Sequence, residues 1–566
     1  MEKYEINVKR WLSSPQVDSP TKAIIEKMSA KEREDAFYKD IEFGTAGMRG
    51  IMGPGTNRFN IHTLRKANIG FAKYLLANFK DARERGVVIA HDNREGADTF
   101  QNLCAEILND FGIKVYVFDS LRPTPELSFA VRYLNTVGGI MITASHNPKE
   151  YNGYKIYDEF GAQLVPEKIA PLIDIINKLG DELNVSYEKM TPRGELILLD
   201  DKVDEEYVKL VLNISLNREL DKSNFRIVFT PQHGASYINA MRVFKTLGYD
   251  IYPVLSQCNP DPNFSGTITP NPEDPRAYVD AIKLAKEVNA NLIVTTDPDG
   301  DRCGLGFLNK KGEYTLLTGN QSAVMLLDYI LKMRKEKGLL SKDGVVYNTI
   351  VTSPFGNDVA KSYGMKVESF LTGFKFIGEQ IHRYEVNGGP HFEFGYEESY
   401  GCLIQDFVRD KDATQAIVMY AEMALYYHLQ GLDLDDVYLA LEKKYGFHED
   451  EVYSMNFIGL EGEVKLKNLL KNLRDNPITY LFDSEVIRLE DYALSIAREG
   501  DKIYPLTLPK SDVFRLFLKN GDIVAIRPSG TEPKCKFYVM AFAKDGSVKG
   551  RAKLLYEALL EKLNLK

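Results

Sequence analysis

The stretch Gly138-Gly139-Ile140-Met141-Ile142-Thr143-Ala144-Ser145-His146-Asn147-Pro148 places an apolar strand directly before a polar loop. The same order recurs where Leu292-Ile293-Val294 leads into Asp297-Pro298-Asp299-Gly300-Asp301-Arg302. Segments with the apolar spacing of amphipathic helices separate such strands. Because this alternation is typical of layered α/β domains, we predict an α/β fold with largely parallel or mixed sheets. Ligands in open α/β sheets bind beyond the carboxyl ends of the strands, so the chemistry is expected in these loops.

Outward from these loops, the chain of 566 residues divides into units of similar length. At ~150 residues per domain, about four domains are expected. Charged residues gather near residue 206, a new helix begins near 319, and shorter strands start after about 446. We therefore expect domains at 1–205, 206–318, 319–446 and 447–566. In the first of these, Thr63 is expected to cap the helix that follows it.

Three carboxylates stand at alternate positions of one short turn, at Asp297, Asp299 and Asp301. Pro298 and Gly300 set the bend, so the three side chains can point toward one hard cation such as Mg²⁺. Without a positive charge, three clustered anions would repel one another. The alternative is a solvated acidic turn, but the spacing favours a cation site.

Ser145 and His146 place a hydroxyl beside an imidazole at the end of a strand. No Gly-x-Ser-x-Gly elbow surrounds the serine, which argues against an acyl-transfer hydrolase. From these residues alone, a polar turn with a structural histidine is the simpler interpretation.

The turn Arg527-Pro528-Ser529-Gly530-Thr531 combines a guanidinium, two hydroxyls and a glycine. These groups are typical of a phosphate cradle, because arginine matches phosphate oxygens in a bidentate way. An ordinary turn with one exposed arginine is the alternative. Nucleotide binding has little support, because neither a Gly-x-Gly-x-x-Gly nor a Gly-Lys-Ser/Thr loop occurs.

The composition excludes several classes of protein. The formal net charge is −9, from 71 Lys and Arg against 80 Asp and Glu, which argues against a nucleic-acid binder. No apolar run of ~18 residues could cross a bilayer, and no signal-peptide pattern opens the chain. The five cysteines are widely spaced and contain no Cys-x-x-Cys pair, as expected in a reducing compartment. We therefore expect a cytoplasmic protein with no nucleic-acid or membrane partner.

Three motifs occur together and in a fixed order: Thr143-Ala144-Ser145-His146-Asn147-Pro148, Asp297-Pro298-Asp299-Gly300-Asp301-Arg302 and Arg527-Pro528-Ser529-Gly530-Thr531-Glu532-Pro533. With them the chain resembles the α-D-phosphohexomutases, and within these the phosphoglucomutase/phosphomannomutase family of the phosphoglucomutase-2 type. The resemblance covers essentially the whole chain. It implies four domains around a central cleft: three similar mixed-sheet α/β domains and a smaller C-terminal α+β domain of the TATA-binding-protein type.

The resemblance also implies roles for individual residues. Ser145 corresponds to the serine that carries the transferable phosphate, and Arg49, His146 and Lys155 to catalytic groups that assist proton transfer around it. Asp297, Asp299 and Asp301 correspond to the Mg²⁺ ligands, together with the phosphoserine oxygen of Ser145. The positions that resemble the family's substrate-binding residues are Arg302, Thr372, Gly373, Lys375, Glu397, Ser399, Lys411, Arg527, Ser529, Gly530 and Thr531. The family's Gly-Glu-x-Ser pattern reads Tyr396-Glu397-Glu398-Ser399 here, so the choice between Glu397 and Glu398 stays open.

The implied activity is that of a phosphoglucomutase, which interconverts glucose 1-phosphate and glucose 6-phosphate through a phosphoserine enzyme. Mg²⁺ and a hexose 1,6-bisphosphate are the implied cofactors, and the expected assembly is a monomer or a homodimer. Phosphopentomutase and phosphomannomutase activities share every motif, although Phe374-Lys375-Phe376 resembles the glucose type. A metal-assisted phosphatase would release phosphate steadily. A catalytically silent sugar-phosphate-binding protein is the non-enzyme alternative, and it should lack Ser145 or one of the aspartates.

Overall fold

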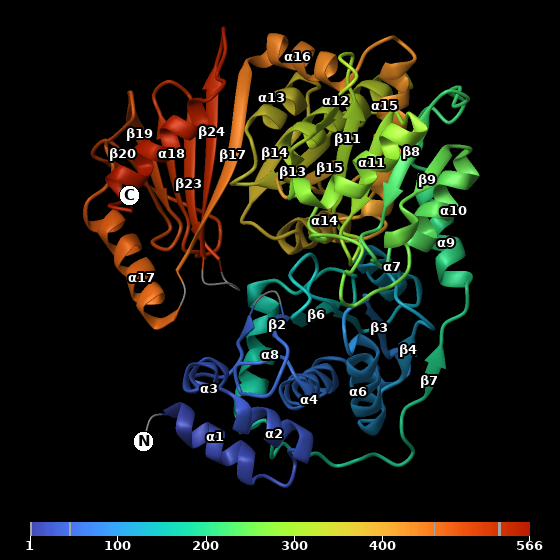
Figure 1. The fold of residues 1–566 in the computed structure, drawn as a ribbon, viewed down its shortest axis with the longest axis vertical. Coiled ribbons are helices and arrows are strands. Elements are labelled where there is room, and N and C mark those ends of the chain that lie inside the picture. Colours follow the sequence, from blue (N-terminus) through green and yellow to red (C-terminus); the bar gives the residue numbers. More distant parts are fainter. Residues whose placement is uncertain (1–2, 45–46, 458, 530–533, 566) are drawn as a thin grey trace.

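The computed structural model describes residues 3–44, 47–457, 459–529 and 534–565, and these build four β-sheets with helices around them (Figure 1). The N-terminal sheet lies below the second and third sheets, and the C-terminal sheet lies beside the third. The expected α/β fold, with three α/β units and a β-rich C-terminal unit, is confirmed. No helix among the described residues is long and apolar enough to span a membrane.

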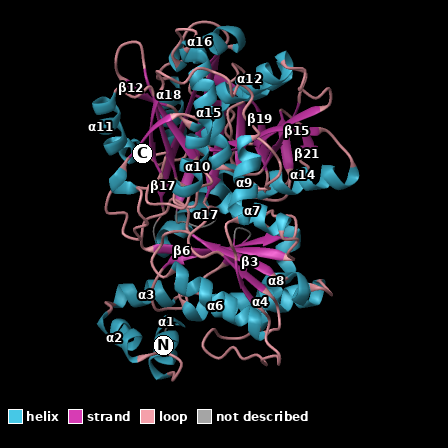
Figure 2. Ribbon diagram, turned by 90° about the vertical axis from the view of Figure 1, so that its right-hand side faces the viewer, coloured by secondary structure: helices cyan, strands magenta, loops and turns pink. Residues whose placement is uncertain are grey.

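The first sheet has seven strands in the order β1-β2-β6-β5-β3-β4-β7. Strands β5, β3, β4 and β7 run parallel to one another, whereas β6, β2 and β1 continue the sheet in antiparallel pairs. Figure 2 shows α4, α6 and α8 on one face of this sheet and α7 on the other. The strands are β1 (Phe43–Gly44), β2 (Gly47–Ile51), β3 (Val87–His91), β4 (Val115–Val117), β5 (Gly138–Ile142), β6 (Tyr151–Asp158) and β7 (Leu196–Leu198). The helices are α1 (Lys3–Ser13), α2 (Ser19–Lys27), α3 (Ala30–Phe37), α4 (Ile61–Asn78), α5 (Ala82–Arg85), α6 (Ala97–Asp110), α7 (Thr124–Tyr133) and α8 (Pro166–Lys178).

Helix α4 begins three residues earlier than expected. Asn60 is its N-cap, and the Asn60 side chain accepts hydrogen bonds from the backbone N–H groups of His62 and Thr63. The Thr63 hydroxyl in turn accepts a hydrogen bond from the backbone N–H of Asn60 at 3.1 Å. The expectation that Thr63 caps the helix is therefore wrong. Thr63 is the third helical residue of a reciprocal capping box, in which each partner satisfies one free N–H.

The second and third sheets are smaller and have mixed strand directions. Their orders are β12-β11-β10-β8-β9 and β14-β13-β15-β16. The strands are β8 (Arg226–Thr230), β9 (Asp250–Pro253), β10 (Leu292–Thr296), β11 (Cys303–Leu308), β12 (Tyr314–Leu316), β13 (Gly344–Thr349), β14 (Lys366–Phe370), β15 (His391–Glu397) and β16 (Gly401–Leu403). The helices are α9 (Lys202–Leu212), α10 (Tyr237–Leu247), α11 (Val279–Val288), α12 (Gly319–Glu336), α13 (Phe355–Ser362), α14 (Lys375–Asn387), α15 (Ala413–His428) and α16 (Leu434–Tyr445), with 3₁₀ turns at Leu255–Gln257 and Pro275–Tyr278.

The C-terminal sheet has the order β17-β24-β23-β22-β19-β20-β21, and β18 pairs with β19. All of its pairings are antiparallel. The elements are β17 (Phe447–Asn456), α17 (Gly459–Asp475), β18 (Tyr480–Leu481), β19 (Ser484–Asp491), β20 (Ile496–Glu499), β21 (Lys502–Pro505), β22 (Phe514–Leu518), β23 (Ile523–Pro528), β24 (Lys534–Ala543) and α18 (Arg551–Lys562).

Apolar packing joins some domains more firmly than others. One continuous core runs through the second and third sheets and includes Leu127 and Phe129 of α7. The C-terminal sheet meets the third sheet through a smaller cluster that includes Ile350, Leu371 and Tyr538. Since α9 is a single helix that packs on α10 and α7, we propose that the first domain boundary lies just before it, rather than between 205 and 206.

Candidate active site

Ser145 lies in the loop that follows β5, at the point where the first domain faces the second. Its side chain is buried, and its Oγ donates a hydrogen bond to Asp297 Oδ2 at 2.8 Å. The same Oγ lies 3.3 Å from His146 Nδ1. The backbone of Ser145 has φ of +52°, in the left-handed region that non-glycine residues rarely adopt. A polar residue held in this conformation in a buried loop is typical of a functional site.

Asp297, Asp299 and Asp301 follow β10, and all three are buried. Each offers one carboxylate oxygen within 4.8 Å of the others, so the predicted cluster is confirmed. Gly300 makes the turn possible with φ of +66°. A Cβ at position 300 would lie 2.8 Å from Pro123 Cβ, so the close approach of the first domain also requires glycine there.

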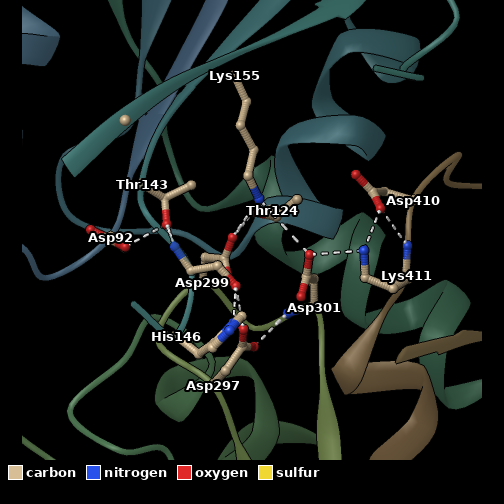
Figure 3. Close-up of polar contacts among 12 residues, drawn as sticks. Asp92, Thr124, Thr143, His146, Lys155, Asp297, Asp299, Asp301, Asp410 and Lys411 are labelled. Carbon is tan, nitrogen blue, oxygen red and sulfur yellow. Dashed lines mark hydrogen bonds and ion pairs between the residues drawn. The ribbon is translucent and has the colours of Figure 1, made fainter. Parts of the chain in front are cut away.

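Two lysines offset part of the negative charge of this cluster (Figure 3). Lys155 Nζ, on β6, donates to Asp299 Oδ2 at 2.7 Å and lies 3.9 Å from Asp301 Oδ2. Lys411 Nζ lies 3.2 Å from Asp301 Oδ2. Burial opposes ionisation of Asp299, but Lys155 holds the pKa of that carboxyl well below its usual range. Burial and the neighbouring charges of Asp299 and Asp301 raise the pKa of Asp297, so the cluster still lacks positive charge.

Two carboxylate oxygens of the cluster indicate where a cation could bind. Among the described residues, Asp299 Oδ1 and Asp301 Oδ1 are buried and make no hydrogen bond. Unpaired buried carboxylate oxygens are costly. Three convergent carboxylates, two of which have an oxygen without a hydrogen bond, are the donor set that hard divalent cations prefer. The residues present therefore fit a divalent metal ion.

Glu397, at the end of β15, links the metal cluster to a loop of the third domain. Its Oε1 accepts the backbone N–H of Gly373 at 2.9 Å, and its Oε2 lies 3.6 Å from Lys411 Nζ. Glu398 points elsewhere and accepts hydrogen bonds from the hydroxyls of Thr349 and Thr352. The geometry favours Glu397 over Glu398 as the residue that faces the site.

Lys375 and Arg527 mark the far side of the site. Burial, together with the neighbouring Arg527 charge, lowers the pKa of Lys375 to about 8. Arg527, on β23, donates to the Tyr538 hydroxyl at 3.1 Å. Thr372 Oγ1 is buried and makes no hydrogen bond among the described residues. The charges of Lys375 and Arg527 thus lie close enough to act on each other, and an anion bound between them would be stabilised.

The remaining predicted residues lie as follows. Arg49 Nη1, on β2, donates to Asn147 Oδ1 at 3.2 Å, beside the Ser145 loop. Ser399 is half-buried just after β15, and the Ser529 backbone N–H donates to the Lys534 carbonyl at 2.8 Å. The predicted positions Gly530 and Thr531 lie outside the described residues.

Arg302 contacts a residue that the sequence did not single out. Its Nη1 pairs with Glu273, whose other carboxylate oxygen lies 4.0 Å from Lys536 of β24. Arg302 Nε lies 3.8 Å from Asp301 Oδ1. Burial and the charges of Arg302, Arg49 and Lys536 hold the pKa of His146 well below its usual range, so His146 is a neutral imidazole. Arg49 of the first domain, Arg302 of the second and Lys536 of the fourth therefore lie near one another. With Lys411 of the third domain, all four domains contribute charge to this region.

Further residues at the site were missed because their signals are weak. Thr124, at the first position of α7, donates its backbone N–H to the Asp299 carbonyl at 2.8 Å and its hydroxyl to Asp299 Oδ2 at 3.1 Å. Asp92 and Arg94 follow β3 in a polar stretch, and both are buried beside the Ser145 loop. Their position at the carboxyl end of a parallel strand was the only signal that could have identified them.

Three models of one protein family match the chain. They are described as phosphoglucomutase/phosphomannomutase, alpha/beta/alpha domain I over residues 40–182, domain II over residues 205–310 and domain III over residues 318–445.

Curated relatives and solved structures agree with these matches. A phosphoglucomutase of Staphylococcus epidermidis is 36% identical over 527 residues, covering 92% of this chain and 94% of the relative. A phosphoglucomutase of Staphylococcus aureus is 36% identical over 534 residues, with 92% and 93% covered. The open form of the Paramecium exocytosis-sensitive phosphoprotein parafusin, a phosphoglucomutase, has a similar fold with a TM-score of 0.65 at 17% identity, covering 93% of this chain and 95% of that one. A phosphoglucomutase/phosphomannomutase family protein from Burkholderia thailandensis also has a TM-score of 0.65, at 18% identity with 92% and 97% covered.

Proposed function

Because the chain belongs to the phosphoglucomutase/phosphomannomutase family, we propose that it is a phosphoglucomutase, which interconverts glucose 1-phosphate and glucose 6-phosphate through a phosphorylated Ser145. The observation that carries this proposal is the contact between Ser145 Oγ and Asp297 Oδ2 at 2.8 Å. It sets a buried hydroxyl against a carboxylate cluster that fits a divalent metal ion. A phosphate on Ser145 would add negative charge beside this cluster, and a bound divalent cation would balance both.

The metal of the proposed site is Mg²⁺, held by Asp297, Asp299, Asp301 and an oxygen of phosphorylated Ser145. When bound, Mg²⁺ would neutralise charge that develops on the phosphoryl oxygens during transfer. Lys155 and Lys411 hold the carboxylates in place by their contacts with Asp299 and Asp301. The three aspartates converge in the fold itself, so little rearrangement is needed during the reaction.

Proton transfer at the serine is proposed for His146, with Arg49 and Lys155 stabilising charge nearby. When Ser145 is rephosphorylated, its hydroxyl proton must leave as the oxygen attacks phosphorus. His146 Nδ1, 3.3 Å from Ser145 Oγ and neutral, can accept that proton. Arg302 Nε lies 4.0 Å from Asp297 Oδ2, the oxygen that accepts the Ser145 hydroxyl, so Arg302 can contact the transferred phosphate once Glu273 releases it.

The second phosphate of the sugar requires a separate binding region. Transfer from Ser145 produces glucose 1,6-bisphosphate, which must turn over before it returns its other phosphate to the serine. We assign the phosphate that is not transferred to Lys375 and Arg527, with the loop of Ser529, Gly530 and Thr531. Thr372, Gly373, Glu397, Ser399 and Lys411 line the proposed sugar position between the two phosphates. Glu397 supports this position, because it lies between Lys411 and the Gly373 loop.

The proposal also covers the activator of the enzyme and its location in the cell. A hexose 1,6-bisphosphate acts as activator by phosphorylating Ser145 in molecules that have lost their phosphate. The proposed location is the cytoplasm, which agrees with five buried cysteines that are all free thiols.

Peptide mass spectrometry of the purified protein tests the proposal. Phosphate is expected on Ser145, and added glucose 1,6-bisphosphate should raise the phosphorylated fraction and the activity together. Ser145→Ala should lose nearly all mutase activity. Ser322→Ala is the matched control, because Ser322 is also a buried serine but its hydroxyl donates to the Gly319 carbonyl in α12 and has no contact with the aspartates among the described residues. A fully active Ser145→Ala protein, or phosphate only on another residue, would contradict the mechanism.

The sugar is tested by comparing kcat/KM for glucose, mannose and ribose 1-phosphates with Mg²⁺ and the matching bisphosphate. The proposal expects glucose 1-phosphate to be preferred. A higher kcat/KM for ribose or mannose 1-phosphate would reassign the substrate without changing the phosphoserine mechanism.

A further inference from the structure

Arg94 is a buried arginine that donates its hydrogen bonds almost entirely to the Ser145 loop. It follows β3, and its side chain is fully shielded from solvent. Its Nη2 donates to the carbonyls of Ser145 at 2.5 Å and Asn147 at 2.6 Å. Its Nη1 donates to the carbonyls of Pro148 at 2.8 Å and Tyr151 at 2.9 Å. A planar guanidinium can serve four carbonyls at once, which an ammonium group cannot do in the same geometry.

Asp92 completes the arrangement from the other side of the loop. Its Oδ1 accepts the Arg94 backbone N–H at 3.0 Å, and its Oδ2 lies 3.4 Å from Arg94 Nε. The same Oδ2 accepts the hydroxyl of Thr143 at 2.5 Å (Figure 3). Thr143 Oγ1 in turn accepts the backbone N–H of Ser145 at 2.8 Å. Both backbone polar groups of Ser145 are therefore bound to side chains of one buried network.

We propose that Arg94, with Asp92 and Thr143, is a positioning residue that holds Ser145 in its left-handed backbone conformation. This inference rests on the proposed role of Ser145 as the phosphate carrier. A non-glycine residue at φ of +52° is strained and persists only where its surroundings fix it. The four charge-assisted hydrogen bonds from Arg94 supply that restraint, because each holds a carbonyl of the loop or of the strand start that follows it.

The conformation matters because it determines where Ser145 Oγ points. At φ of +52° the hydroxyl reaches Asp297 and lies beside His146. If the loop relaxed to an ordinary conformation, the oxygen would move away from the metal cluster. A misplacement of about 1 Å can reduce a reaction rate ~100-fold, because transfer requires near-attack geometry. Loss of Arg94 should therefore reduce kcat much more than it changes KM, since Arg94 contacts none of the proposed substrate-binding residues among the described contacts.

The test is Arg94→Ala, assayed for kcat, KM and thermal stability with and without free guanidinium ion. We expect kcat to fall about 100-fold and KM to change less than about threefold. Guanidinium, at concentrations far below those that unfold proteins, should restore at least a tenth of the lost kcat by filling the vacated space. The kcat of Arg94→Lys should remain low, because an ammonium group keeps the positive charge but cannot donate to four carbonyls with the planar geometry of a guanidinium.

Arg334→Ala is the matched control, because it separates positioning from general stability. Arg334 is also buried, and it donates to the carbonyls of Glu393 and Ile404 and to the Glu393 carboxylate in the third domain. Its loss should lower thermal stability with kcat changed less than about threefold and no guanidinium effect on kcat. If Arg94→Ala and Arg334→Ala lose kcat in equal measure, or if guanidinium restores neither, the positioning role is wrong.

Thr143→Val keeps the test decisive if Arg94→Ala does not fold. The valine preserves shape but removes the hydroxyl that joins Asp92 to the Ser145 backbone. Two hydrogen bonds are lost, one of them to the charged Asp92, and we expect kcat to fall at least about tenfold. An unchanged kcat would overturn the inference. A fully active Ser145→Ala protein would instead refute the proposed function, so the two failures can be told apart.

Discussion

Asp299→Asn changes one oxygen to nitrogen at the centre of the proposed metal site. The substitution keeps the size of the side chain and removes one negative charge. Asp299 Oδ2 contacts Lys155 at 2.7 Å and Thr124 at 3.1 Å, so one side of the carboxylate is already occupied. Its Oδ1 is buried and makes no hydrogen bond among the described residues, so this oxygen is open to a metal ion. The substitution should therefore act on metal binding more than on packing.

The magnitude follows from the loss of one charged contact. A hydrogen bond or ligand contact to a charged group is worth ~1.5–3 kcal/mol, so the Mg²⁺ Kd should rise about 10- to 150-fold. At a Mg²⁺ concentration 100 times the wild-type Kd, binding stabilises the wild-type protein by about 2.7 kcal/mol. The same concentration would stabilise Asp299→Asn by only about 0.3–1.4 kcal/mol. The difference should be visible as a smaller shift of Tm on adding Mg²⁺.

Calorimetric Mg²⁺ titration and thermal unfolding with and without Mg²⁺ are the assays, together with turnover at limiting Mg²⁺. Asp110→Asn is the matched control, because Asp110 is also fully buried and paired, with Lys189 at 2.9 Å and Arg193 at 2.7 Å. It should lower Tm equally with and without Mg²⁺. An Asp299→Asn protein with wild-type Mg²⁺ affinity and near-normal rate at limiting Mg²⁺ would refute the assignment of the metal site.

Three further predictions concern charge elsewhere in the molecule. Arg527→Ala should raise KM for glucose 1-phosphate about tenfold or more, because a charge-assisted contact worth ~1.5–3 kcal/mol is lost. Quenched-flow assays of this variant should also show more free bisphosphate. If KM and the amount of free bisphosphate are both unchanged, Arg527 does not belong to the site. Because Lys375 has a pKa of about 8, kcat/KM should fall above pH 8 as its charge is lost, and Lys375→Arg should move that limb to higher pH in a pH–rate profile. Burial raises the pKa of Asp450 to about 7. Between about pH 4 and 7 the folded state therefore keeps a proton that the unfolded state has lost. Over this range the free energy of unfolding falls as pH rises. Asp450→Asn should therefore raise Tm relative to the wild type more at pH 8 than at pH 5, and an equal effect at both would contradict the shift.

Local sequence predicted where the chemically active loops begin. The apolar run at Gly138–Ile142 is β5, and the run that starts at Leu292 is β10, each followed directly by its polar loop. The alternate spacing of Asp297, Asp299 and Asp301 predicted one cluster, and the three carboxylates do converge. These features could be predicted because strand burial and turn spacing are encoded within a few residues of one another.

Contacts between distant segments could not be predicted in the same way. Thr124 contacts Asp299 across 175 positions of sequence, and nothing around Thr124 distinguishes it from an ordinary helix start. Arg94 lies in a polar stretch that reads like a solvent-exposed loop, yet it is buried. The hydrophobic pattern of a sequence indicates where strands end. It does not indicate which of the following loops come into contact, because that depends on how whole domains pack.

The distribution of positive charge explains why the site needs all four domains. A bisphosphate intermediate beside the aspartate cluster brings several negative charges into one buried region, and a single domain offers too few cations to balance them. The first domain supplies Lys155, the second Arg302, the third Lys375 and Lys411, and the fourth Arg527. The fourth domain meets the third through a small apolar cluster that includes Tyr538 and through the stacked rings of His448 and Phe355, and it brings Arg527 to the proposed site of the second phosphate. Retention of the intermediate while it turns over should therefore depend on the fourth domain, whereas the transfer step depends on the rigid junction between the first and second domains, where Thr124 and Lys155 contact Asp299 directly.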